Sequence, residues 1–305
     1  MSAENTVTFY LHPKLRKQAE RGNHNLIESV GDVLKSSGLE IAFDGDDDLA
    51  RMRARSRPGR GLFLMDEPPN ERSLTFRKTY IYPFWRIEQH AKRWEWPVAK
   101  ELFNPDSKHA RKAANFYRFW QNRLFEEKAQ SVKQDGFVYV PLQGRLTTKR
   151  SFQLCSPIEM VAKVLEHDPK RYVMATLHPN EVYSHEEQQA LERLIAQNER
   201  LYVRTGASER YLQNCDYIVT QNSSVGFLGY FFEKPLILFG KVDFHHISLN
   251  TWDMPISDAF QSVVAHRPDY AAYMHWFLQL RSINAGRSEA KTRIRTSLRN
   301  HGWPV

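Results

Sequence analysis

Three polar residues, Asn222, Ser223 and Ser224, interrupt two apolar runs in the segment TQNSSVGFLGYFFEKPLILFG at 220–240. The run before them has the pattern of a buried strand, and the run after them has that of a helix. Free backbone N–H groups and the helix dipole favour an anion at such a junction, and two serine hydroxyls add donors. The same residue types are the usual caps of a helix, so an anion site and a simple cap both remain open.

A second polar junction follows the strand pattern RYVMATLH, where His178 and Pro179 begin the segment HPNE. Proline restricts the backbone of the turn, and an imidazole can donate a hydrogen bond to a phosphate or ribose oxygen. A histidine in an ordinary strand-to-helix turn is the alternative. Because ligands of open α/β sheets bind at the carboxyl ends of the strands, we expect both junctions at one ligand-binding edge.

Carboxylates follow a third apolar pattern, GLFLMD at 61–66, where Asp66 and Glu67 precede two prolines. A carboxylate at a strand end can serve as a general base or as a nucleophile, and we predict that Asp66 and Glu67 are the catalytic residues. A solvated loop or a cap is the alternative. The acidic run at 44–48 lacks a fixed ligand spacing, so we interpret it as the first turn of a helix and predict no metal site. Asp243, His245 and His246 follow a later strand and suit either nucleotide contact or a surface loop.

Strand and helix patterns alternate along most of the chain, which favours parallel sheets with crossover helices. A long helical pattern from about 106 to 133 separates two such series, and helical patterns at 256–265, 268–282 and 288–299 end the chain. We therefore predict an α/β fold of two Rossmann-like domains facing across a cleft, with the C-terminal helices packing back. The predicted domains are 1–133, with the bridging helix, and 134–305, with the terminal helices.

The composition favours a globular, basic protein. The 305 residues carry a formal charge of +8, with 41% hydrophobic residues and two cysteines without metal spacing. No signal-peptide pattern and no apolar stretch of membrane-spanning length is present, so we expect a cytoplasmic location. Basic residues interleave with aromatics between 60 and 96, which suits an acidic glycan or the surface of an anionic membrane. The sequence contains no DNA- or RNA-binding motif, so charge alone supports a nucleic-acid partner.

The run from Val138 to Phe244 resembles the bacterial capsule polysaccharide biosynthesis family, which includes Kdo-transferring glycosyltransferases of the GT-B architecture. The matching motifs are VPLQ at 140–143, HPNE at 178–181 and DYIVTQNSSVGFLGYFFEKPLILFG at 216–240. The His-Pro turn and the serine pair are also similar to those of bacterial transferases that use CMP-sialic acid. The resemblance implies that the CMP part of a CMP-sugar binds to the matching residues, which are His178, Pro179, Ser223 and Ser224, with Asn222 beside them.

The resemblance further implies transfer of an acidic, Kdo-like sugar from a CMP-activated donor to a cell-surface polysaccharide or glycolipid, with no additional cofactor. It makes 1–133 the acceptor-side domain and 134–305 the nucleotide-sugar-binding domain. Partners would be the nucleotide-sugar donor, an acidic glycan or glycolipid acceptor, and an anionic membrane touched peripherally. One departure matters: the family carries acids after Pro-Leu-Gln, whereas Arg145, Lys149 and Arg150 follow Gln143 here. That departure supports an alternative, a non-catalytic capsule-assembly or glycan-binding protein that retains the nucleotide cleft.

Overall fold

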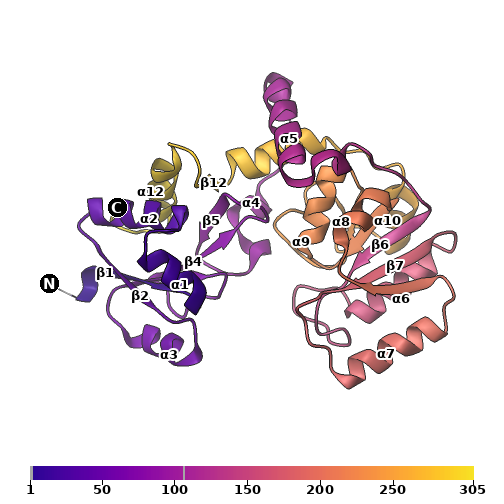
Figure 1. The fold of residues 1–305 in the computed structure, drawn as a ribbon, viewed down its shortest axis with the longest axis horizontal. Helices are drawn as coiled ribbons and strands as arrows, with labels where there is room; N and C mark the ends of the chain where they lie inside the picture. Colours follow the sequence, from indigo (N-terminus) through magenta and orange to yellow (C-terminus); the bar gives the residue numbers. More distant parts are fainter. Residues whose placement is uncertain (1–2, 106) are drawn as a thin grey trace. The chain divides into compact units, whose positions relative to one another are not determined.

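The computed structural model describes residues 3–105 and 107–305, which form two compact units (Figure 1). The first unit combines the residues up to Lys100 with Phe277–Val305, and the second is Glu101–Trp276. The sequence-based boundary at 133/134 therefore lies inside the second unit. It differs because the helix expected to bridge the domains packs within the second unit, while the end of the chain returns to the first.

A six-stranded sheet forms the first unit, in the order β12-β5-β4-β3-β1-β2. The strands β2, β1, β3 and β4 run parallel, β5 is antiparallel to β4, and β12 is antiparallel to β5. The strands are β1 (Thr6–Tyr10), β2 (Glu40–Asp44), β3 (Arg60–Leu64), β4 (Ser73–Lys78), β5 (Phe84–Glu88) and β12 (Ile283–Asn284). The helices are η1 (Ala3–Asn5), α1 (Pro13–Glu20), α2 (Asn25–Ser36), α3 (Asp48–Ser56), η2 (Arg93–Glu95), α4 (Pro97–Lys100) and α12 (Ala290–Asn300).

The C-terminal helix α12 packs against α2 and β5 of the first unit (Figure 1). Ile294 and Leu298 are buried in the same core cluster as the apolar face of α2. Arg295 adds hydrogen bonds from its guanidinium to the hydroxyls of Ser36 and Ser37 at the end of α2, at 2.8 and 3.1 Å. These contacts confirm the predicted return for the last helix, whereas the helices near 256–274 stay in the second unit.

The second unit contains a fully parallel sheet, in the order β11-β10-β9-β6-β7-β8. Its strands are β6 (Phe137–Pro141), β7 (Tyr172–Leu177), β8 (Leu201–Thr205), β9 (Tyr217–Thr220), β10 (Leu236–Leu238) and β11 (Leu249–Asn250). Its helices are η3 (Ser107–His109), α5 (Ala110–Phe125), η4 (Glu126–Ala129), α6 (Pro157–His167), α7 (His185–Ala196), α8 (Ser208–Asn214), α9 (Ser224–Gly229), η5 (Tyr230–Phe232), α10 (Ile256–Val263) and α11 (Tyr270–Met274). The chain returns to the first unit through a π-helical turn, His275–Leu280. Asp106, where the sequence pattern starts the bridging helix, lies outside the described residues.

The strand order of the second unit reverses between β6 and β9, as in the doubly wound dinucleotide-binding fold. Successive residues Val138, Tyr139 and Val140 of β6 are all fully buried, which shows that helices cover both faces of the sheet. The first unit reverses its order between β1 and β3 in the same manner. The predicted class, two Rossmann-like α/β domains, is confirmed. Among the residues described, no helix has the length and apolarity needed to cross a membrane.

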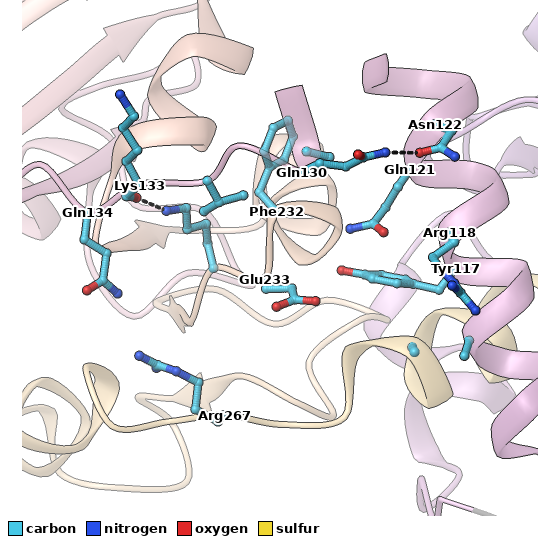
Figure 2. Close-up of a pocket in the computed structure, with 15 residues that line it drawn as sticks. Tyr117, Arg118, Gln121, Asn122, Gln130, Lys133, Gln134, Phe232, Glu233 and Arg267 are labelled. Atoms are coloured by element: carbon cyan, nitrogen blue, oxygen red, sulfur yellow. Dashed lines mark hydrogen bonds between the residues drawn. The ribbon is translucent and has the colours of Figure 1, made fainter. Parts of the chain in front are cut away.

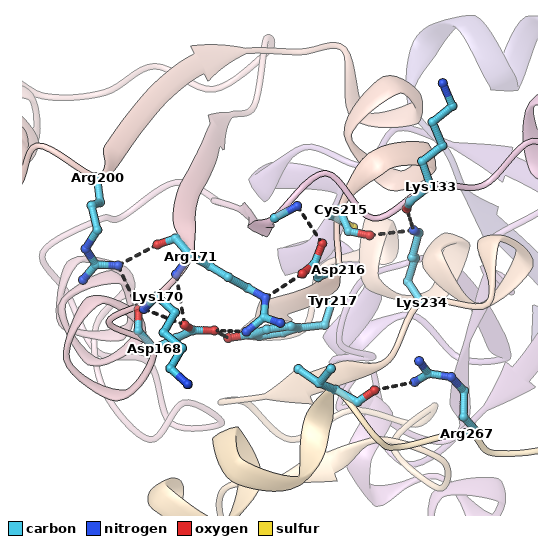
Figure 3. Close-up of polar contacts among 12 residues, drawn as sticks. Lys133, Asp168, Lys170, Arg171, Arg200, Cys215, Asp216, Tyr217, Lys234 and Arg267 are labelled. Atoms are coloured by element: carbon cyan, nitrogen blue, oxygen red, sulfur yellow. Dashed lines mark hydrogen bonds and ion pairs between the residues drawn. The ribbon is translucent and has the colours of Figure 1, made fainter.

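A polar network closes the amino-terminal edge of the second sheet (Figure 3). Asp168 accepts hydrogen bonds from the Tyr217 hydroxyl at 2.7 Å and from Arg171 at 3.1 Å, and Arg171 also donates to Asp216 at 2.6 Å. Burial raises the pKa of Asp168, but the bonds from Tyr217 and Arg171 outweigh burial and hold that pKa below its usual range. The network joins the start of β9 to the turn before β7.

Replacing Tyr217 with Phe is expected to lower the free energy of unfolding by about 1.5–3 kcal/mol at neutral pH. The change removes one buried hydrogen bond to a carboxylate and keeps the ring. Urea denaturation measures the loss. Tyr172→Phe is the matched control, because the Tyr172 side chain is exposed and the change should be nearly neutral. Equal stability of the two variants would show that the Tyr217 hydroxyl contributes nothing.

Candidate functional site

The two polar junctions found in the sequence meet at one edge of the second sheet. His178 follows β7 and Ser223 follows β9, and β6 lies between these strands. Because neighbouring strands are spaced by about 4.8 Å, the two junctions stand roughly 10 Å apart along the edge. The Thr220 hydroxyl donates to the Pro141 carbonyl at 3.2 Å, which ties the ends of β9 and β6 together. This edge is the point where the strand order reverses, the usual ligand position in such sheets.

The serine pair divides into a cap and an exposed residue. Ser223 is buried, and its hydroxyl accepts a hydrogen bond from the Val225 amide at 3.2 Å, so it is the N-cap of α9. Ser224 is exposed at the first position of the helix, while Asn222 before the pair is buried. Of the two alternatives left by the sequence, the cap describes Ser223, and Ser224 remains accessible to a ligand.

His178 presents one ring nitrogen to solvent. Its Nδ1 accepts a hydrogen bond from the Asn180 amide at 3.2 Å, and its own amide donates to the Tyr183 hydroxyl at 2.9 Å. An accepting Nδ1 in a neutral imidazole places the proton on Nε2, which makes Nε2 a donor. His178 and Pro179 are both exposed, so this donor is accessible at the edge.

The loop after β6 folds over the same edge and pairs with the segment after β10. Leu154 donates its amide to Phe239 and Lys241 donates to Phe152, both at 2.8 Å, while Gln153 forms an antiparallel bridge with Gly240. A Cβ on Gly240 would lie 3.0 Å from the Gln221 carbonyl oxygen, so this close packing requires glycine. The loops that follow β6, β9 and β10 therefore form one packed layer.

Four side chains of this layer bury polar atoms that have no hydrogen-bond partner in the described part of the chain. The atoms are Gln143 Oε1, Arg150 Nε and Nη2, Gln153 Nε2 and Gln221 Oε1. Folded proteins rarely leave such groups unpaired, and a gathering of them at the carboxyl edge indicates a place for a ligand or ordered water. Sequence reasoning missed Gln153 and Gln221, although each adjoins an expected strand end or its loop.

Arg150 gives this layer a positive character. Its guanidinium lies over the Phe152 ring, 5.0 Å from the centroid. Burial lowers the pKa of Arg150, the nearby Arg145 lowers it further, and Glu181 of the HPNE segment opposes them. Glu181 also packs against Gly144, where a Cβ would collide with its carboxylate. Cationic side chains therefore occupy the place where acids were expected, and they suit an anionic ligand.

The segment after β10 carries the two histidines noted in the sequence. The ring of His245 stacks on Trp252 with centroids 6.0 Å apart, and His246 Nδ1 lies 3.0 Å from the Tyr273 hydroxyl. Burial lowers the pKa of His245 to about 4, so the ring is neutral at pH 7. Asp243 in the same segment is fully buried, so the alternative of a plain surface loop does not describe it.

The neutral His245 predicts a loss of stability in acid. In the unfolded chain its pKa returns to about 6.5, so stability is fully present above that pH and declines as the pH falls towards 4. Between pH 7 and 4.5 the wild type should lose roughly 2 kcal/mol more than His245→Gln. Denaturant titrations at several pH values measure this difference. The exposed His185→Gln is the control, and an acid loss in His245→Gln equal to that of the wild type would contradict the assignment.

The predicted catalytic residues lie in the first unit, beyond the end of β3. Asp66 forms an ion pair with Arg51 of α3, and its Oδ1 accepts the Glu67 amide at 2.9 Å. Glu67 accepts the Ala91 amide at 2.8 Å, and its other oxygen lies 3.4 Å from His90 Nδ1. The two carboxylate side chains remain 46% and 45% exposed. Each is therefore anchored and accessible, and His90 is a neighbour that the sequence pattern did not indicate.

Comparison with known proteins points to one family and one fold. The family model described as "Capsule polysaccharide biosynthesis protein" matches residues 99–287, more than half of the chain. The structure of a Thermosulfurimonas dismutans KpsC beta Kdo 2,7 transferase is similar, with a TM-score of 0.55 and 12% identity over 97% of this chain and 98% of that one. The KpsC beta Kdo 2,4 transferase of the same organism gives a TM-score of 0.50 and 11% identity, over 89% and 90%. No curated protein sequence matches the chain.

Proposed function

The chain belongs to the capsule polysaccharide biosynthesis protein family, and from that premise we propose that it transfers an acidic, Kdo-like sugar from a CMP-activated donor to a cell-surface polysaccharide or glycolipid. The observation that carries the proposal is the carboxyl edge of the second sheet. There an exposed imidazole donor, an exposed serine at a helix start and a cationic loop surround the reversal of strand order. The fold, shared with Kdo transferases, supports the same reaction class.

The CMP moiety would span the edge from His178 to Ser224. The Nε2 of His178 and the Ser224 hydroxyl are donors for phosphate or ribose oxygens, and the roughly 10 Å between the junctions suits a nucleotide. Arg150, with two buried and unpaired nitrogen atoms, supplies charge for the phosphate. With this charge supplied by the protein, the proposed reaction uses no metal and no cofactor beyond the donor substrate.

The acceptor hydroxyl would be deprotonated by a carboxylate, that of Glu67 or Asp66. The acceptor oxygen then forms a bond to the anomeric carbon of the donor sugar, the bond from that carbon to the CMP phosphate oxygen breaks, and CMP leaves with the electron pair. The proton passes to the carboxylate. Glu67 is the better candidate for this role, because the charge of Asp66 is already paired with that of Arg51.

The non-catalytic alternative rests on the cationic loop after Gln143. If that loop replaced a catalytic acid, the protein would bind the donor or its product without transferring the sugar. We place either activity in the cytoplasm, peripheral to the inner membrane. The two buried, free cysteines are consistent with a reducing compartment.

A ligand panel tests the proposal. We expect CMP to raise the melting temperature of the full chain at millimolar concentration, with UMP and UDP giving smaller shifts and a short oligonucleotide giving none. Transfer is then measured from CMP-Kdo to an acidic oligosaccharide. Absence of any CMP effect would contradict the proposed donor, while CMP binding without transfer would support the non-catalytic alternative. A shift with the oligonucleotide alone would favour nucleic-acid binding.

A further inference from the structure

A cavity of about 870 Å³ opens at the opposite, amino-terminal edge of the second sheet (Figure 2). Its walls are residues 114–122 of α5, the segment 129–134 before β6, the turn 232–234 before β10, and residues 267–271. The volume falls in the range of small-molecule sites. It shares no lining residue with the carboxyl edge described above, so it is a separate feature of this unit.

The residues that line the cavity include more basic than acidic side chains. Arg118, Lys133, Lys234 and Arg267 line it against a single carboxylate, that of Glu233. Arg118, Lys133 and Arg267 are exposed and form no ion pair within the described ranges. The Arg267 guanidinium is held in place by the carbonyls of Val264 and His266, at 2.8 and 2.9 Å. The charges of Arg118 and Arg267 are therefore left to an outside partner.

Lys234 fixes the wall of the cavity. Its side chain is buried, and its Nζ donates to the carbonyls of Lys133 and Cys215, both at 2.5 Å (Figure 3). Burial lowers the pKa of Lys234, while Cys215 and Asp216 oppose that shift. The segment before β6 is thereby fastened to the sheet, which holds Lys133 and its neighbours in position.

The remaining lining is rich in planar amides. Gln121, Asn122, Gln130 and Gln134 supply amide groups, and the buried Tyr117 and Phe232 lie behind them. Gln121 uses its Nε2 on the Phe231 carbonyl at 2.7 Å, so its oxygen is left as an acceptor. Next to the cavity, the buried Tyr270 hydroxyl has no hydrogen-bond partner in the part of the chain described, and it interacts electrostatically with Arg267 and Glu233. Such a lining suits a ligand that carries many hydroxyls and a negative charge.

We propose that this cavity binds a segment of an acidic saccharide chain, away from the edge proposed for the donor nucleotide. The identity of the polymer rests on the proposed function, because an acidic glycan is the acceptor and product of that reaction. Simple anions are a poorer match, since the cavity is far larger than a phosphate ion. Holding a distant part of the polymer raises the effective concentration of its end, so long acceptors gain more from the cavity than short ones.

The test compares a pentamer of sialic acid, as a generic acidic saccharide, with maltopentaose and inorganic phosphate, by calorimetric titration of the full chain. We expect the wild type to bind the acidic pentamer and bind maltopentaose at least tenfold more weakly. Arg118→Gln combined with Arg267→Gln should weaken acidic pentamer binding at least tenfold and leave the thermal shift with CMP unchanged. Arg193→Gln, an exposed change on α7, is the matched control.

The outcomes separate the two proposals. Equal binding of the acidic pentamer by the wild type and the double variant would overturn the cavity assignment, as would equal binding of maltopentaose. Phosphate that competes fully with the pentamer at equal concentration would reduce the site to a simple anion site and overturn its saccharide specificity. Binding of the pentamer through Arg118 and Arg267 in a protein that shows no CMP effect would support the cavity and contradict the proposed donor. The melting temperature of the double variant verifies that it is folded.

Discussion

Replacing Glu67 with Gln is expected to lower sugar transfer by about a hundredfold or more while CMP binding stays nearly intact. A general base typically contributes a factor of this size, and the amide cannot accept the acceptor's proton. The fold should tolerate the change, because the amide oxygen can still accept the Ala91 amide that Glu67 binds at 2.8 Å. Initial rates from CMP-Kdo, together with CMP titrations, measure the two effects separately.

Asp66→Asn and Glu71→Gln complete this experiment. Asp66 is paired with Arg51, so we expect its replacement to reduce transfer less than that of Glu67. Glu71 is an exposed acid of the same segment, and its change should leave the rate unaltered. Full activity in both the Asp66 and the Glu67 variants would make the catalytic assignment wrong. A wild type that binds CMP and transfers nothing would place the chain with the non-catalytic alternative.

The second large effect is expected at the serine pair. Replacing Ser223 and Ser224 together with Ala should weaken CMP binding, because each lost hydrogen bond to a charged phosphate is worth about 1.5–3 kcal/mol. A single loss corresponds to roughly 10- to 150-fold in affinity. Calorimetric titration with CMP measures the change, and Ser262→Ala, an exposed serine of α10, is the control. Unchanged affinity in the double variant would remove the serine pair from the site.

The single variants separate binding from folding. Ser223 caps α9, so Ser223→Ala should also lower the free energy of unfolding by about 1 kcal/mol. Ser224 makes no capping bond, so Ser224→Ala should weaken CMP binding with little change in stability. If Ser223→Ala lowers stability and leaves CMP affinity unchanged, then Ser223 serves only the helix and Ser224 alone contacts the nucleotide.

Strands with unbroken apolar runs were predictable because helices cover both faces of the sheet. The patterns GFVYVPL and DYIVTQ correspond to β6 and β9, and their residues are buried on both sides. The strands β4 and β5 lie in the segment between 60 and 96 where basic residues interleave with aromatics, and neither strand was predicted. There Arg86 and Glu88 are 6% and 7% exposed, although charge in a sequence normally indicates solvent. Arg86 is accommodated by the ring of Phe277, 5.0 Å away, a partner from the far end of the chain.

The sequence allowed us to predict the sheet edge that holds the candidate site, but not the buried residues that cover this edge. His178 and Ser224 could be located because strand ends of a parallel sheet converge at one edge. The buried polar groups of Arg150 and Gln153 could not be located in this way. They become buried only through the pairing of 152–154 with 239–241. Local sequence contains no signal for contacts of that range. The role of Ser223 as a cap also depends on where α9 begins, and patterns locate helix starts only within a few residues.

The order in which the two units can be completed during synthesis follows from the return of the chain to its first unit. The second unit is one continuous stretch, Glu101–Trp276, whereas the first needs Phe277–Val305 for the outer strand β12 and for α12. During synthesis, the N-terminal part of the first unit therefore stays incomplete while the second unit is made and folds. Over that time the apolar face of α2 and the edge of β5 are uncovered. A chain that lacks its last helix would keep those surfaces open, so exposure to chaperones and proteases falls mainly on the N-terminal half.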